Sequence, residues 1–379
     1  RTYTQEQRLG TGHAVMAARE ATAHGHDDVV VLNGDAPLIS PETINSARQT
    51  LADGADIVVM GFYADNPAGY GRMLMKDDNL LAIREQKDAS AKEKEVNYCN
   101  SGIFAFQGGK LPSLLDALTN DNAQGEFYLT DVVEIGNKTG LSVKAMTVEE
   151  DETRGVNDRV QLADVEDIWQ HRKREQLLLS GVTMQAPDTI IFSHDTKIAR
   201  DTVIEPYVVF GPGVEVGEGA RIRAFSHLED ASVGSSAVVG PYARLRPGSR
   251  LESNAKIGNF VETKNVNVGV GAKINHLSYV GDSDVGAGAN IGAGVITCNY
   301  DGVNKHRTTI GEGAFIGTNT ALVAPVSVGN AAMTAAGSTI TKDVPDDGLA
   351  IERSDQRNID GLAKRLRARN EAVKAAKSK

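Results

Sequence analysis

Aliphatic residues recur at every sixth position through the second half of this chain, and this period constrains the fold more than any other feature. The series begins at Ile198 and ends at Ile340, with one-residue slips before Val233 and Val285. An amphipathic helix repeats its apolar positions about every 3.6 residues and a half-buried strand every second residue. A period of six is instead typical of a parallel β-helix, in which each hexapeptide forms one flat face and turns a corner. We therefore predict an all-β parallel β-helix over residues 183–351.

Bulk composition sets broad limits on location and partners. The chain has 379 residues, which is too long for one compact core and predicts two domains. Its formal net charge of −10 argues against nucleic acid as a partner. No apolar run approaches the length of a membrane span and no secretory signal is evident, so we expect no membrane association. Cys99 and Cys298 are too few for a disulfide framework, and we expect reduced thiols in a cytoplasmic protein.

Residues 1–158 alternate between strand-like and helical segments, which predicts an α/β domain with a Rossmann-like fold. Residues 29–32 form a continuous apolar run, of the kind expected for a strand buried on both faces of a parallel sheet. Ser40 is a favourable helix N-cap and Pro41 a favourable first helical residue. Strands are predicted at residues 29–32, 57–60 and 103–106, and helices at residues 41–51 and 130–136.

The remaining boundaries follow from changes in the apolar pattern. Residues 159–182 have helical spacing up to Gly181, which predicts a linker helix before the repeats. Residues 297–309 break the period of six and are expected to form a loop outside the solenoid. From residue 352 onward, the sequence contains nine Lys and Arg residues and only four Asp and Glu residues. We expect residues 352–379 to form a basic tail, with a short helix that gives way to disorder.

Two motifs of the first domain suggest a nucleotide site. Asp35 follows the predicted strand 29–32, where open α/β sheets bind ligands, and a hard cation that holds a triphosphate uses such an oxygen. The alternative is that residues 33–35 form only a turn. Residues 10–13 lead into a helix expected to begin near Ala14, and they would suit contact with a base or a phosphate. A tight turn is the alternative here also.

A histidine in the repeat region stands out among otherwise structural positions. His276 lies two residues after the inward Ile274, so its ring should face outward. A histidine can accept a proton from an amine at neutral pH, and two cations with a tyrosine suit a sugar phosphate. An incidental surface histidine is the alternative. The polar neighbours expected on adjacent coils are Arg246, Glu262, Lys264, Asn275 and Tyr279.

Six short segments in a fixed order carry a family resemblance. They are Gln5–His13 (QEQRLGTGH), Asn33–Asp35, Gly69–Arg72, Asn100–Gly102, Gly125–Asp131 and Gly155–Asn157. Together with the repeats they resemble the bifunctional bacterial N-acetylglucosamine-1-phosphate uridyltransferase / glucosamine-1-phosphate acetyltransferase family over essentially the whole chain. The resemblance implies a left-handed parallel β-helix and a homotrimer. It also implies synthesis of UDP-N-acetylglucosamine, a cell-wall precursor, by acetyl transfer and then uridylyl transfer.

For the first domain, the resemblance implies uridylyl transfer from UTP to N-acetylglucosamine 1-phosphate. It implies that Asp35 and Asn157 ligate Mg²⁺ and that Asn157 also belongs to the UDP-N-acetylglucosamine site. The residues it assigns to uridine are Gln5, Gly10 and Thr11, and those it assigns to the amino sugar are Gly71, Glu85 and Asn100.

One feature of the family's first domain is missing from this sequence. The family carries a Gly-x-Gly-Thr-Arg loop and a following Lys that cradle the triphosphate, about seventy residues of chain being expected before Gln5. We expect an N-terminally truncated domain whose sheet has an unpaired edge. We also expect little or no uridyltransferase activity from these 379 residues.

For the repeat domain, the resemblance implies acetyl transfer from acetyl-CoA to glucosamine 1-phosphate, with His276 as the general base. The residues implied to bind the sugar phosphate are Arg246, Lys264, Tyr279 and Asn290. Those implied to line the acetyl-CoA site are Ala293, Asn299, Tyr300, Thr318, Ala336 and Arg353. Thr318 stands where the family usually has Ser, which keeps the hydroxyl.

Lesser roles are also expected near this site. Glu262 is a candidate to orient His276 or its neighbours, and Arg353 or Lys305 suits the coenzyme phosphates. Cys298 is expected to take no part. Residues 298–308 are expected to reach a neighbouring subunit, and the basic tail to close over coenzyme A.

Two other functions are compatible with the repeat period. A monofunctional sugar-phosphate nucleotidyltransferase could use the β-helix for regulation and oligomerisation alone. A non-enzymatic trimerisation or carbohydrate-binding scaffold could have the same repeats. Neither would need His276 with Lys264 and Arg246, nor the loop that carries Asn299 and Tyr300.

Overall fold

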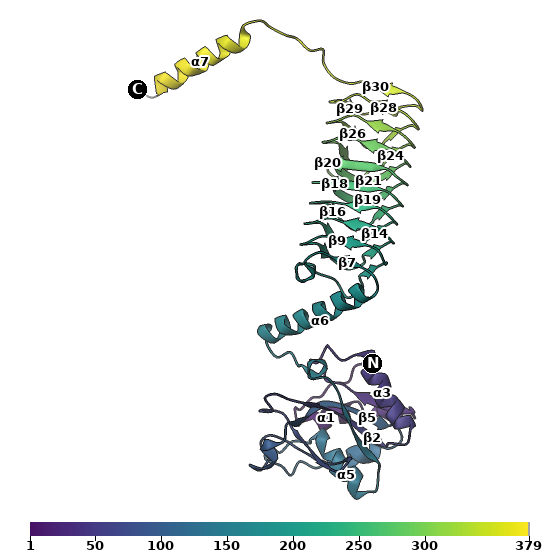
Figure 1. Ribbon diagram of the computed structural model, residues 1–379, viewed down its shortest axis with the longest axis vertical. Helices are drawn as coiled ribbons and strands as arrows, with labels where there is room; N and C mark the ends of the chain where they lie inside the picture. Colours follow the sequence, from purple (N-terminus) through teal and green to yellow (C-terminus); the bar gives the residue numbers. More distant parts are fainter. Residues whose placement is uncertain (378–379) are drawn as a thin grey trace. The chain divides into compact units, whose positions relative to one another are not determined.

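The computed structural model describes residues 1–377, which form two compact units. Unit 1 is Arg1–Trp169 and unit 2 is Gln170–Lys379, so the division falls inside helix α6 (Arg159–Leu179; Figure 1). The last two residues of the predicted tail lie outside the described residues. No helix of residues 1–377 is both long and apolar enough to cross a membrane.

Unit 1 is built on a six-stranded mixed sheet in the order β4-β3-β5-β2-β6, with β1 on β5. Strand β5 runs antiparallel to β1, β2 and β3, whereas β2 and β6 are parallel. The strands are β1 Asp28–Val31, β2 Ile57–Tyr63, β3 Arg72–Lys76, β4 Asn79–Arg84, β5 Tyr98–Gln107 and β6 Val143–Thr147. The α-helices are α1 Thr11–Ala17, α2 Arg19–Thr22, α3 Pro41–Ala52, α4 Leu111–Asp116 and α5 Val132–Lys138. The 3₁₀ helices are η1 Glu93–Glu95, η2 Leu129–Asp131 and η3 Glu150–Thr153.

Strand β2 is buried on both faces of this sheet, as its apolar run predicts. Ile57 and Val59 belong to one buried cluster, which also includes residues of α4 and α5. Val58 and Met60 belong to a second cluster, which includes residues of α3. Successive side chains of a strand point to opposite faces, so helices on both sides bury every residue of the run.

The strand predicted at residues 29–32 is present as β1, but its predicted burial on both faces of a parallel sheet is wrong. Strand β1 is half-buried along its length, and Leu32 beyond it is 43% exposed. Among the described residues β1 pairs with β5 alone, and it does so antiparallel. An apolar run identifies a strand but does not reveal its neighbours, which are distant in sequence.

Local helix signals agree with the structure to within a few residues. Helix α3 begins at Pro41, and the Ser40 hydroxyl oxygen accepts a hydrogen bond from the Thr43 backbone amide at 3.0 Å. The helix predicted over residues 130–136 is α5, preceded by η2. The helix expected to begin near Ala14 starts earlier, at Thr11.

Unit 2 is a parallel β-helix of three faces, stacked coil on coil (Figure 1). One face contains β7 Thr183–Met184, β9 Val203–Ile204, β12 Arg221–Ile222, β15 Val238–Val239, β18 Lys256–Asn259, β20 Lys273–His276, β22 Asn290–Ile291, β25 Phe315–Ile316, β28 Met333–Thr334 and β30 Leu349–Ala350. The second contains β8 Lys197–Ile198, β11 Glu215–Val216, β14 Ala231–Val233, β17 Ser249–Leu251, β24 Thr308–Ile310 and β27 Val326–Val328. The third contains β10 Val209–Phe210, β13 His227–Leu228, β16 Arg244–Leu245, β23 Ile296–Cys298, β26 Ala321–Val323 and β29 Thr339–Ile340. Strands β19 Glu262–Val268 and β21 Tyr279–Val285 bend around a corner and join the second face to the third.

The period of six is confirmed as the inward-facing set of the solenoid. Every aliphatic residue of the series from Ile198 to Ile340 is buried. At many repeats a small residue four positions later is also buried, close to the corner at which the chain turns. These small residues are fully buried alanines at 220, 237, 255, 272, 289, 314 and 332.

The first coil is covered by the C-terminal part of α6. The Gln170 side-chain amide donates to the Phe192 carbonyl at 2.7 Å and accepts from the Phe192 amide at 3.0 Å. Nε of Arg174 donates to the Ile190 carbonyl at 3.1 Å. Both side chains are buried, so α6 satisfies backbone groups at the open end of the stack. Gly181, with φ of 96°, follows the end of the helix.

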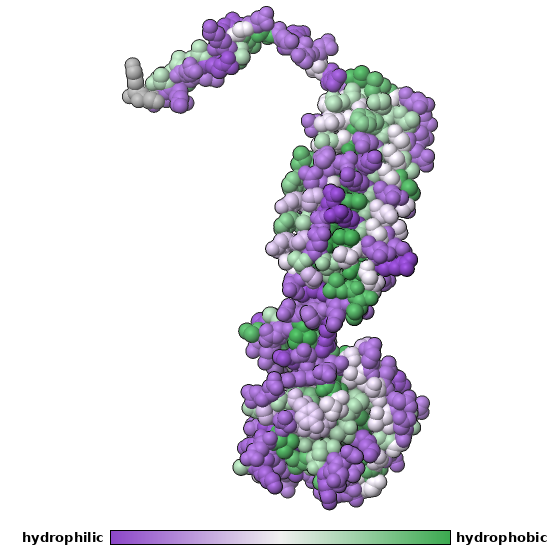
Figure 2. Space-filling model, viewed as in Figure 1, coloured by the Kyte–Doolittle hydropathy of each residue, from purple (hydrophilic) through white to green (hydrophobic). Residues whose placement is uncertain are grey.

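The chain beyond the solenoid has a helix with a hydrophilic surface. Helix α7, Leu362–Lys377, has no buried residue among those described, and most of its surface is hydrophilic (Figure 2).

Cys99 and Cys298 are both free thiols, the first buried and the second half-buried.

Candidate functional site

His276 lies at the end of β20, beside Asn259 at the end of β18 on the preceding coil. The two are paired residues of neighbouring parallel strands. His276 is exposed, as its spacing from Ile274 predicts. Nδ1 of His276 donates a hydrogen bond to the Asn259 amide oxygen at 2.6 Å. Because an amide oxygen has no proton to give, this bond keeps the proton on Nδ1 and leaves the lone pair on Nε2.

A row of residues continues from His276 along the following coils, and we call it the His276 row. Backbone hydrogen bonds join the equivalent corners: Gly294 N donates to His276 O, Asn319 N to Ala293 O and Gly337 N to Thr318 O. Arg353 then donates through Nη1 to the Ala336 carbonyl at 2.9 Å. The row is His276, Ala293, Thr318 and Ala336, with Arg353 at its end. Four of the six residues expected to line an acetyl-CoA site are therefore aligned by the stacking of coils.

Cationic side chains gather on the face next to the His276 row. Lys305 lies beside Lys264, and this neighbouring ammonium is the largest cause of a lowered pKa at Lys264. Burial and the charge of Arg246 lower this pKa further. Three cationic side chains gathered in this way form a site that an anion would stabilise. We call Arg246, Lys264 and Lys305 the cation cluster.

The contacts of Glu262 fit the orientation of Arg246, a neighbour of His276, rather than of His276 itself. Its carboxylate accepts from Nη1 of Arg246 at 2.8 Å and lies 3.9 Å from Nη1 of Arg244. Asn259, rather than Glu262, holds His276. The reason is register: Glu262 pairs across the sheet with Tyr279 and Arg244, whereas Asn259 pairs with His276.

Asn299 and Tyr300 begin the loop that interrupts the repeats, and their side chains have different surroundings. Asn299 is buried, and its amide donates to Asp282 and, at 3.5 Å, to the Tyr279 hydroxyl. Tyr300 is 60% exposed. The structure thus brings Asn299 to Tyr279, which was expected to bind the sugar phosphate, and not into the His276 row.

The loop itself is an ordered hairpin. Tyr300 and Lys305 form an antiparallel bridge, and His306 N donates to Asn299 O at 2.8 Å. Nε2 of His306 lies 2.7 Å from the Asp301 carboxylate, and this contact with two backbone amides holds the pKa of Asp301 well below its usual value. The hairpin places Lys305 beside Lys264 rather than beside Arg353. Asn290 lies on β22, paired with Lys273, three residues before Ala293.

Unit 1 contains a cavity of about 310 Å³ next to the end of β1. Its lining includes Thr11, Glu85 and Asn100, three of the residues expected to bind nucleotide or sugar. Glu85 accepts a hydrogen bond from the Thr130 hydroxyl at 3.1 Å. Burial raises the pKa of Glu85, the Thr130 hydrogen bond opposes this shift, and the nearby Asp131 and Asp88 add to it.

The other predicted residues of unit 1 lie around this cavity. Nε2 of Gln5 donates to the Gly10 carbonyl at 3.0 Å, and the backbone amide of Asn100 donates to the Gly71 carbonyl at 2.9 Å. A Cβ on Gly71 would lie 3.4 Å from the Glu85 carboxylate. Gly10, with φ of 105°, passes so close to Phe127 that a Cβ would lie 2.6 Å from its carbonyl oxygen. The glycine at position 10 therefore has a packing reason as well as the predicted binding role.

The side chains of Asp35 and Asn157, the two residues expected to ligate Mg²⁺, both approach Gly155. The Val156 amide donates to the Asp35 carbonyl at 2.8 Å. A Cβ on Gly155 would lie 3.6 Å from Oδ2 of Asp35 and 3.9 Å from Nδ2 of Asn157. One carboxylate and one amide oxygen fit Mg²⁺, which takes few protein ligands and completes its shell with water and phosphate oxygens. Residues 1–377 contain no group of three or more His, Cys, Asp or Glu arranged to hold a metal.

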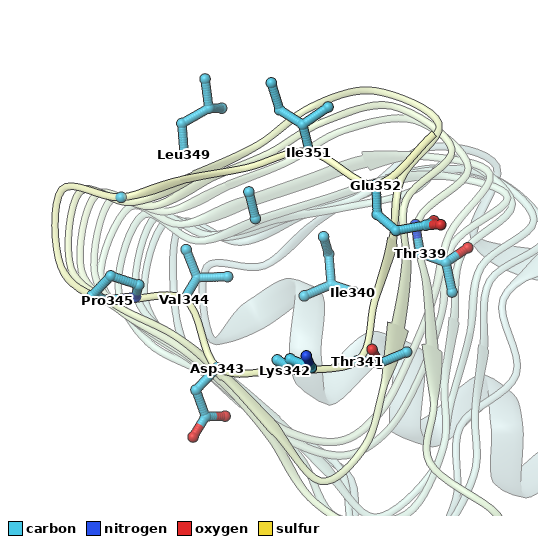
Figure 3. A pocket seen from close by; sticks show the side chains of 12 residues that line it. Thr339, Ile340, Thr341, Lys342, Asp343, Val344, Pro345, Leu349, Ile351 and Glu352 are labelled. Carbon is cyan, nitrogen blue, oxygen red and sulfur yellow. The ribbon is translucent and has the colours of Figure 1, made fainter. Parts of the chain in front are cut away.

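The last coil of the solenoid leaves an open cavity of about 430 Å³ (Figure 3). Ile340 and Val344 lie on the inside of the coil, the side chains of Leu349 and Ile351 point away from the inside, and Glu352 lies at the edge of the cavity. None of the lining residues is a predicted site residue, although Arg353 follows directly in sequence. This cavity is the uncovered end of the apolar interior.

Three functional contacts were not foreseen from the sequence. Asn259 orients His276, Thr130 bonds Glu85, and Lys305 joins Lys264. The signal for Asn259 was available, because a polar residue 17 positions before His276 occupies the same place on the preceding coil. The other two contacts join segments whose approach depends on tertiary structure.

Family comparisons match both parts of the chain. A nucleotidyl transferase family model matches residues 1–151, and a bacterial transferase hexapeptide model, of six repeats, matches residues 195–229. The bifunctional protein GlmU of Agrobacterium fabrum is 54% identical over 377 residues, covering 100% of this chain and 83% of the relative. The protein of the same name from Rhizobium rhizogenes is 56% identical over 375 residues, covering 99% and 83%. That of Jannaschia sp. is 54% identical over 378 residues, covering 100% and 83%.

Solved structures resemble the chain less closely. The structure of LpxA from Acinetobacter baumannii is 19% identical and aligns with a TM-score of 0.37, covering 48% of this chain and 77% of that one. The relatives above instead match nearly the whole chain at more than half identity. The chain therefore belongs to the GlmU family of bifunctional acetyltransferases and uridyltransferases.

Proposed function

We propose that unit 2 transfers the acetyl group of acetyl-CoA to glucosamine 1-phosphate, with His276 as the general base. The observation that carries this proposal is the hydrogen bond from Nδ1 of His276 to Asn259 at the start of the His276 row. A bond of this kind fixes one tautomer and leaves Nε2 as the proton acceptor. The exposed position of His276 leaves that nitrogen open to a substrate amine.

The reaction then follows from the groups around His276. Nε2 takes a proton from the substrate amine, whose nitrogen bonds to the thioester carbonyl carbon. The carbon–sulfur bond breaks, and the sulfur of coenzyme A receives the proton. No covalent enzyme intermediate is needed, so Cys298 has no role in this scheme. General base catalysis of this kind contributes roughly 10² to 10⁴-fold to a rate.

The substrates would lie on either side of His276. The cation cluster, with Tyr279 and Asn290, would hold the phosphate and hydroxyls of glucosamine 1-phosphate, since clustered cations favour an anion. The His276 row would hold the pantetheine arm, because it runs straight from the base towards Arg353. Arg353 would then meet a coenzyme phosphate. For Asn299, we propose that its amide positions Tyr279.

In unit 1 we propose that the cavity lined by Thr11, Glu85 and Asn100 belongs to the site of uridylyl transfer from UTP to N-acetylglucosamine 1-phosphate, a site that these 379 residues do not complete because they include no Gly-x-Gly-Thr-Arg loop. Asp35 and Asn157 would hold Mg²⁺, which when bound neutralises phosphate charge. Gln5, Gly10 and Thr11 would contact uridine. Gly71, Glu85 and Asn100 would contact the amino sugar, and the missing side chain at Gly71 leaves its backbone close to the Glu85 carboxylate.

We also propose that three copies associate and that residues 298–308 reach a neighbouring subunit. The hairpin is held by its own bridge and hydrogen bonds, which favours it as a rigid arm. Tyr300 at its start is 60% exposed, as a residue that contacts a second copy would be in an isolated chain. A cytoplasmic location remains a prediction of the sequence.

The acetyl-transfer proposal is tested by thiol release from acetyl-CoA in the presence of glucosamine 1-phosphate. We expect His276→Ala to lower kcat by roughly 10² to 10⁴-fold while circular dichroism and the melting temperature stay unchanged. His227→Ala is the matched control, since His227 is also exposed on a β-helix strand but lies on another face. Full activity of folded His276→Ala protein would exclude the general-base role. Absence of thiol release from the unaltered chain would favour the alternative of a non-catalytic β-helix.

A further inference from the structure

One carboxylate at a corner of the β-helix is buried, unlike the others in the same backbone conformation. Asp201, Asp230, Asp282 and Asp347 all have a positive φ, which Asp adopts more readily than most residues. The other three are exposed, whereas Asp282 is only 8% exposed. Burying a carboxylate is costly unless hydrogen bonds or an opposite charge compensate for it. The ion pairs formed within residues 1–377 do not include Asp282, so its hydrogen bonds have to compensate.

Both carboxylate oxygens of Asp282 accept hydrogen bonds from side-chain amides. Nδ2 of Asn265, on the preceding coil, donates to Oδ1 at 2.6 Å, and Nδ2 of Asn299 donates to Oδ2. Asn299 is itself 8% exposed, at the start of the hairpin that interrupts the repeats. A carboxylate accepts hydrogen bonds but cannot donate them, so it determines which end of each amide faces it. The NH₂ group of Asn299 is therefore turned towards Asp282.

The same NH₂ group of Asn299 also donates to the Tyr279 hydroxyl. Nδ2 lies 3.5 Å from this oxygen, which has no other hydrogen-bond partner within residues 1–377. Because Asn299 is the donor, the hydroxyl oxygen accepts, and its own hydrogen is left for a different acceptor. Hydrogen bonds in series polarise one another, so an anion that accepts from Tyr279 would also strengthen the contact with Asn299.

The position of the Tyr279 hydroxyl depends on a glycine that lies against it. A Cβ on Gly281 would lie 2.4 Å from this hydroxyl and 2.9 Å from Nδ2 of Asn299. Gly281 has no positive φ, so the space and not the backbone conformation requires glycine here. The Gly281 amide donates to the buried Thr297 hydroxyl at 2.8 Å, which holds this part of strand β21 in place. The ring of Tyr279 can therefore lie along its own strand and reach Asn299.

We infer that Asp282 is a positioning residue of the acetyltransferase site, which acts through Asn299 to leave the Tyr279 hydroxyl proton free for the phosphate of glucosamine 1-phosphate. We call Asp282, Asn299 and Tyr279 the Asp282 network. The inference rests on the proposed function, in which Tyr279 and the cation cluster hold the sugar phosphate. A phosphate anion accepts hydrogen bonds, so a tyrosine whose proton pointed inward would present it with lone pairs instead. The network thus adds a directed donor to the charge of the cations.

The charge of Asp282 also affects the cation cluster. The lowered pKa of Lys264 is caused first by Lys305, then by burial and Arg246, and Asp282 opposes these effects. Replacing Asp282 by a neutral residue would therefore change the charge of the site as well as the direction of its hydrogen bonds. A decisive variant has to keep the carboxylate and reverse only that direction.

The test exchanges two side chains, in the double variant Asp282→Asn with Asn299→Asp. Net charge and side-chain volume are nearly preserved, and Asn suits the left-handed conformation at position 282. A carboxylate at position 299 can only accept, so the Tyr279 hydroxyl has to donate inward and its proton is lost to the phosphate. The matched control is the exchange Asn267→Asp with Asp284→Asn. Nδ2 of Asn267 donates to Asp284 at 2.7 Å, between the same two strands but outside the network.

Calorimetry with glucosamine 1-phosphate would measure the affinity of each folded protein. We expect its dissociation constant to rise at least tenfold in the exchanged variant, which is about 1.4 kcal/mol, and to stay unchanged in the control. In the assay of thiol release, KM for glucosamine 1-phosphate should rise more than kcat falls, because His276 and Asn259 are unaltered. An exchanged variant that binds as tightly as the control would overturn the inference and leave the proposed function standing. An unaltered chain that does not bind glucosamine 1-phosphate would overturn both.

The variant Tyr279→Phe separates the direction of the hydrogen bonds from a merely structural effect. It should weaken binding in the unaltered chain but cause no further loss in the exchanged variant, where the proton already points inward. An equal loss in both backgrounds would overturn the inference.

Two single variants give a result even if the exchanged variant does not fold. Gly281→Ala places a Cβ against the Tyr279 hydroxyl and should weaken binding about as much as Tyr279→Phe. Tyr279→Phe alone removes one oxygen atom and should keep the melting temperature of the unaltered chain. Unchanged affinity of Tyr279→Phe for glucosamine 1-phosphate would overturn the inference, because the hydroxyl proton would then have no role in binding.

Discussion

At the scale of single residues, the candidate sites depend on hydrogen bonds that choose one state of a titratable group. Asn259 selects the tautomer of His276. Thr130 donates to Glu85, which burial otherwise favours in its neutral form. In both cases a neutral partner prepares a group for its task without adding charge. Each partner can therefore be tested by an exchange that changes its charge or its capacity for hydrogen bonding.

Asn259 is expected to act as a positioning residue. Asn259→Ala should lower kcat for acetyl transfer roughly tenfold, because His276 then loses the contact that holds its ring. Asn259→Asp should restore the contact but place a carboxylate beside the ring, which favours the protonated imidazole. The acidic limb of the pH–rate profile should therefore move to higher pH in Asn259→Asp. An unchanged profile, with activity equal to that of the unaltered chain, would show that the contact has no role in proton transfer.

Glu85 should lower the stability of unit 1 at neutral pH. Because burial raises its pKa, the folded state binds a proton over a range where the unfolded chain has released it. The stability that Glu85 contributes is complete at low pH and is lost as pH rises through the raised pKa. Glu85→Gln should therefore unfold at a higher urea concentration at neutral pH, and the gain should shrink as pH falls through the raised pKa and vanish below about pH 4.

The same exchange should weaken binding of N-acetylglucosamine 1-phosphate, if the proposed sugar contact is right. Glu134→Gln is a suitable control, because Glu134 forms exposed ion pairs with Arg84 and Lys138 and lies outside the cavity. A loss of stability at neutral pH in Glu85→Gln would contradict the argument from burial.

At the scale of elements, some helices and strands are determined by local sequence signals, whereas the pairing of strands is determined by tertiary packing. Helix α3 and strand β2 are predictable because capping and apolar runs are local. Strand β1 was identified correctly, yet its antiparallel pairing with β5 is decided by residues more than seventy positions away. The hexapeptide coils are the favourable case. Their register follows from the repeat, so neighbours in space can be counted along the sequence.

The N-cap of α3 offers a test at this scale. Ser40→Ala removes the acceptor for the Thr43 amide and should lower the free energy of unfolding of unit 1 by about 1 kcal/mol. Ser40→Asn should retain most of the stability, because Asn is an equally good N-cap. Urea denaturation followed by circular dichroism would measure both. Equal loss in the two variants would mean that the hydroxyl has another role, such as its 2.9 Å contact with the Thr43 side chain.

At the scale of the whole molecule, the chain consists of two compact units, and α6 is divided between them. Its buried side chains Gln170 and Arg174 bond to the first coil of the β-helix. The helix is thus part of the β-helix unit as well as the connection to unit 1. All residues proposed for acetyl transfer lie in unit 2.

Residues 159–379 are therefore expected to fold and to catalyse acetyl transfer without unit 1. Their kcat should lie within a few-fold of the value for the full chain, since no proposed residue is removed. A shorter polypeptide that begins at residue 182 is the control, and it should be less stable because it lacks the buried contacts of Gln170 and Arg174. Thiol release and thermal unfolding would measure the two effects. Loss of activity in folded 159–379 would show that unit 1 contributes to the acetyltransferase site.

The solenoid could be read from the sequence because its period links local pattern to spatial neighbourhood. Once the inward residues of the repeat are known, His276, Ala293, Thr318 and Ala336 fall at the same place on successive coils, each two positions after an inward residue. The mixed sheet of unit 1, the partner of Glu262 and the approach of Lys305 to Lys264 could not be counted in this way. Each depends on the position that a strand or loop outside the repeats takes in the folded structure. Burial and pairing across the whole fold decide that position, and no local stretch of sequence contains it.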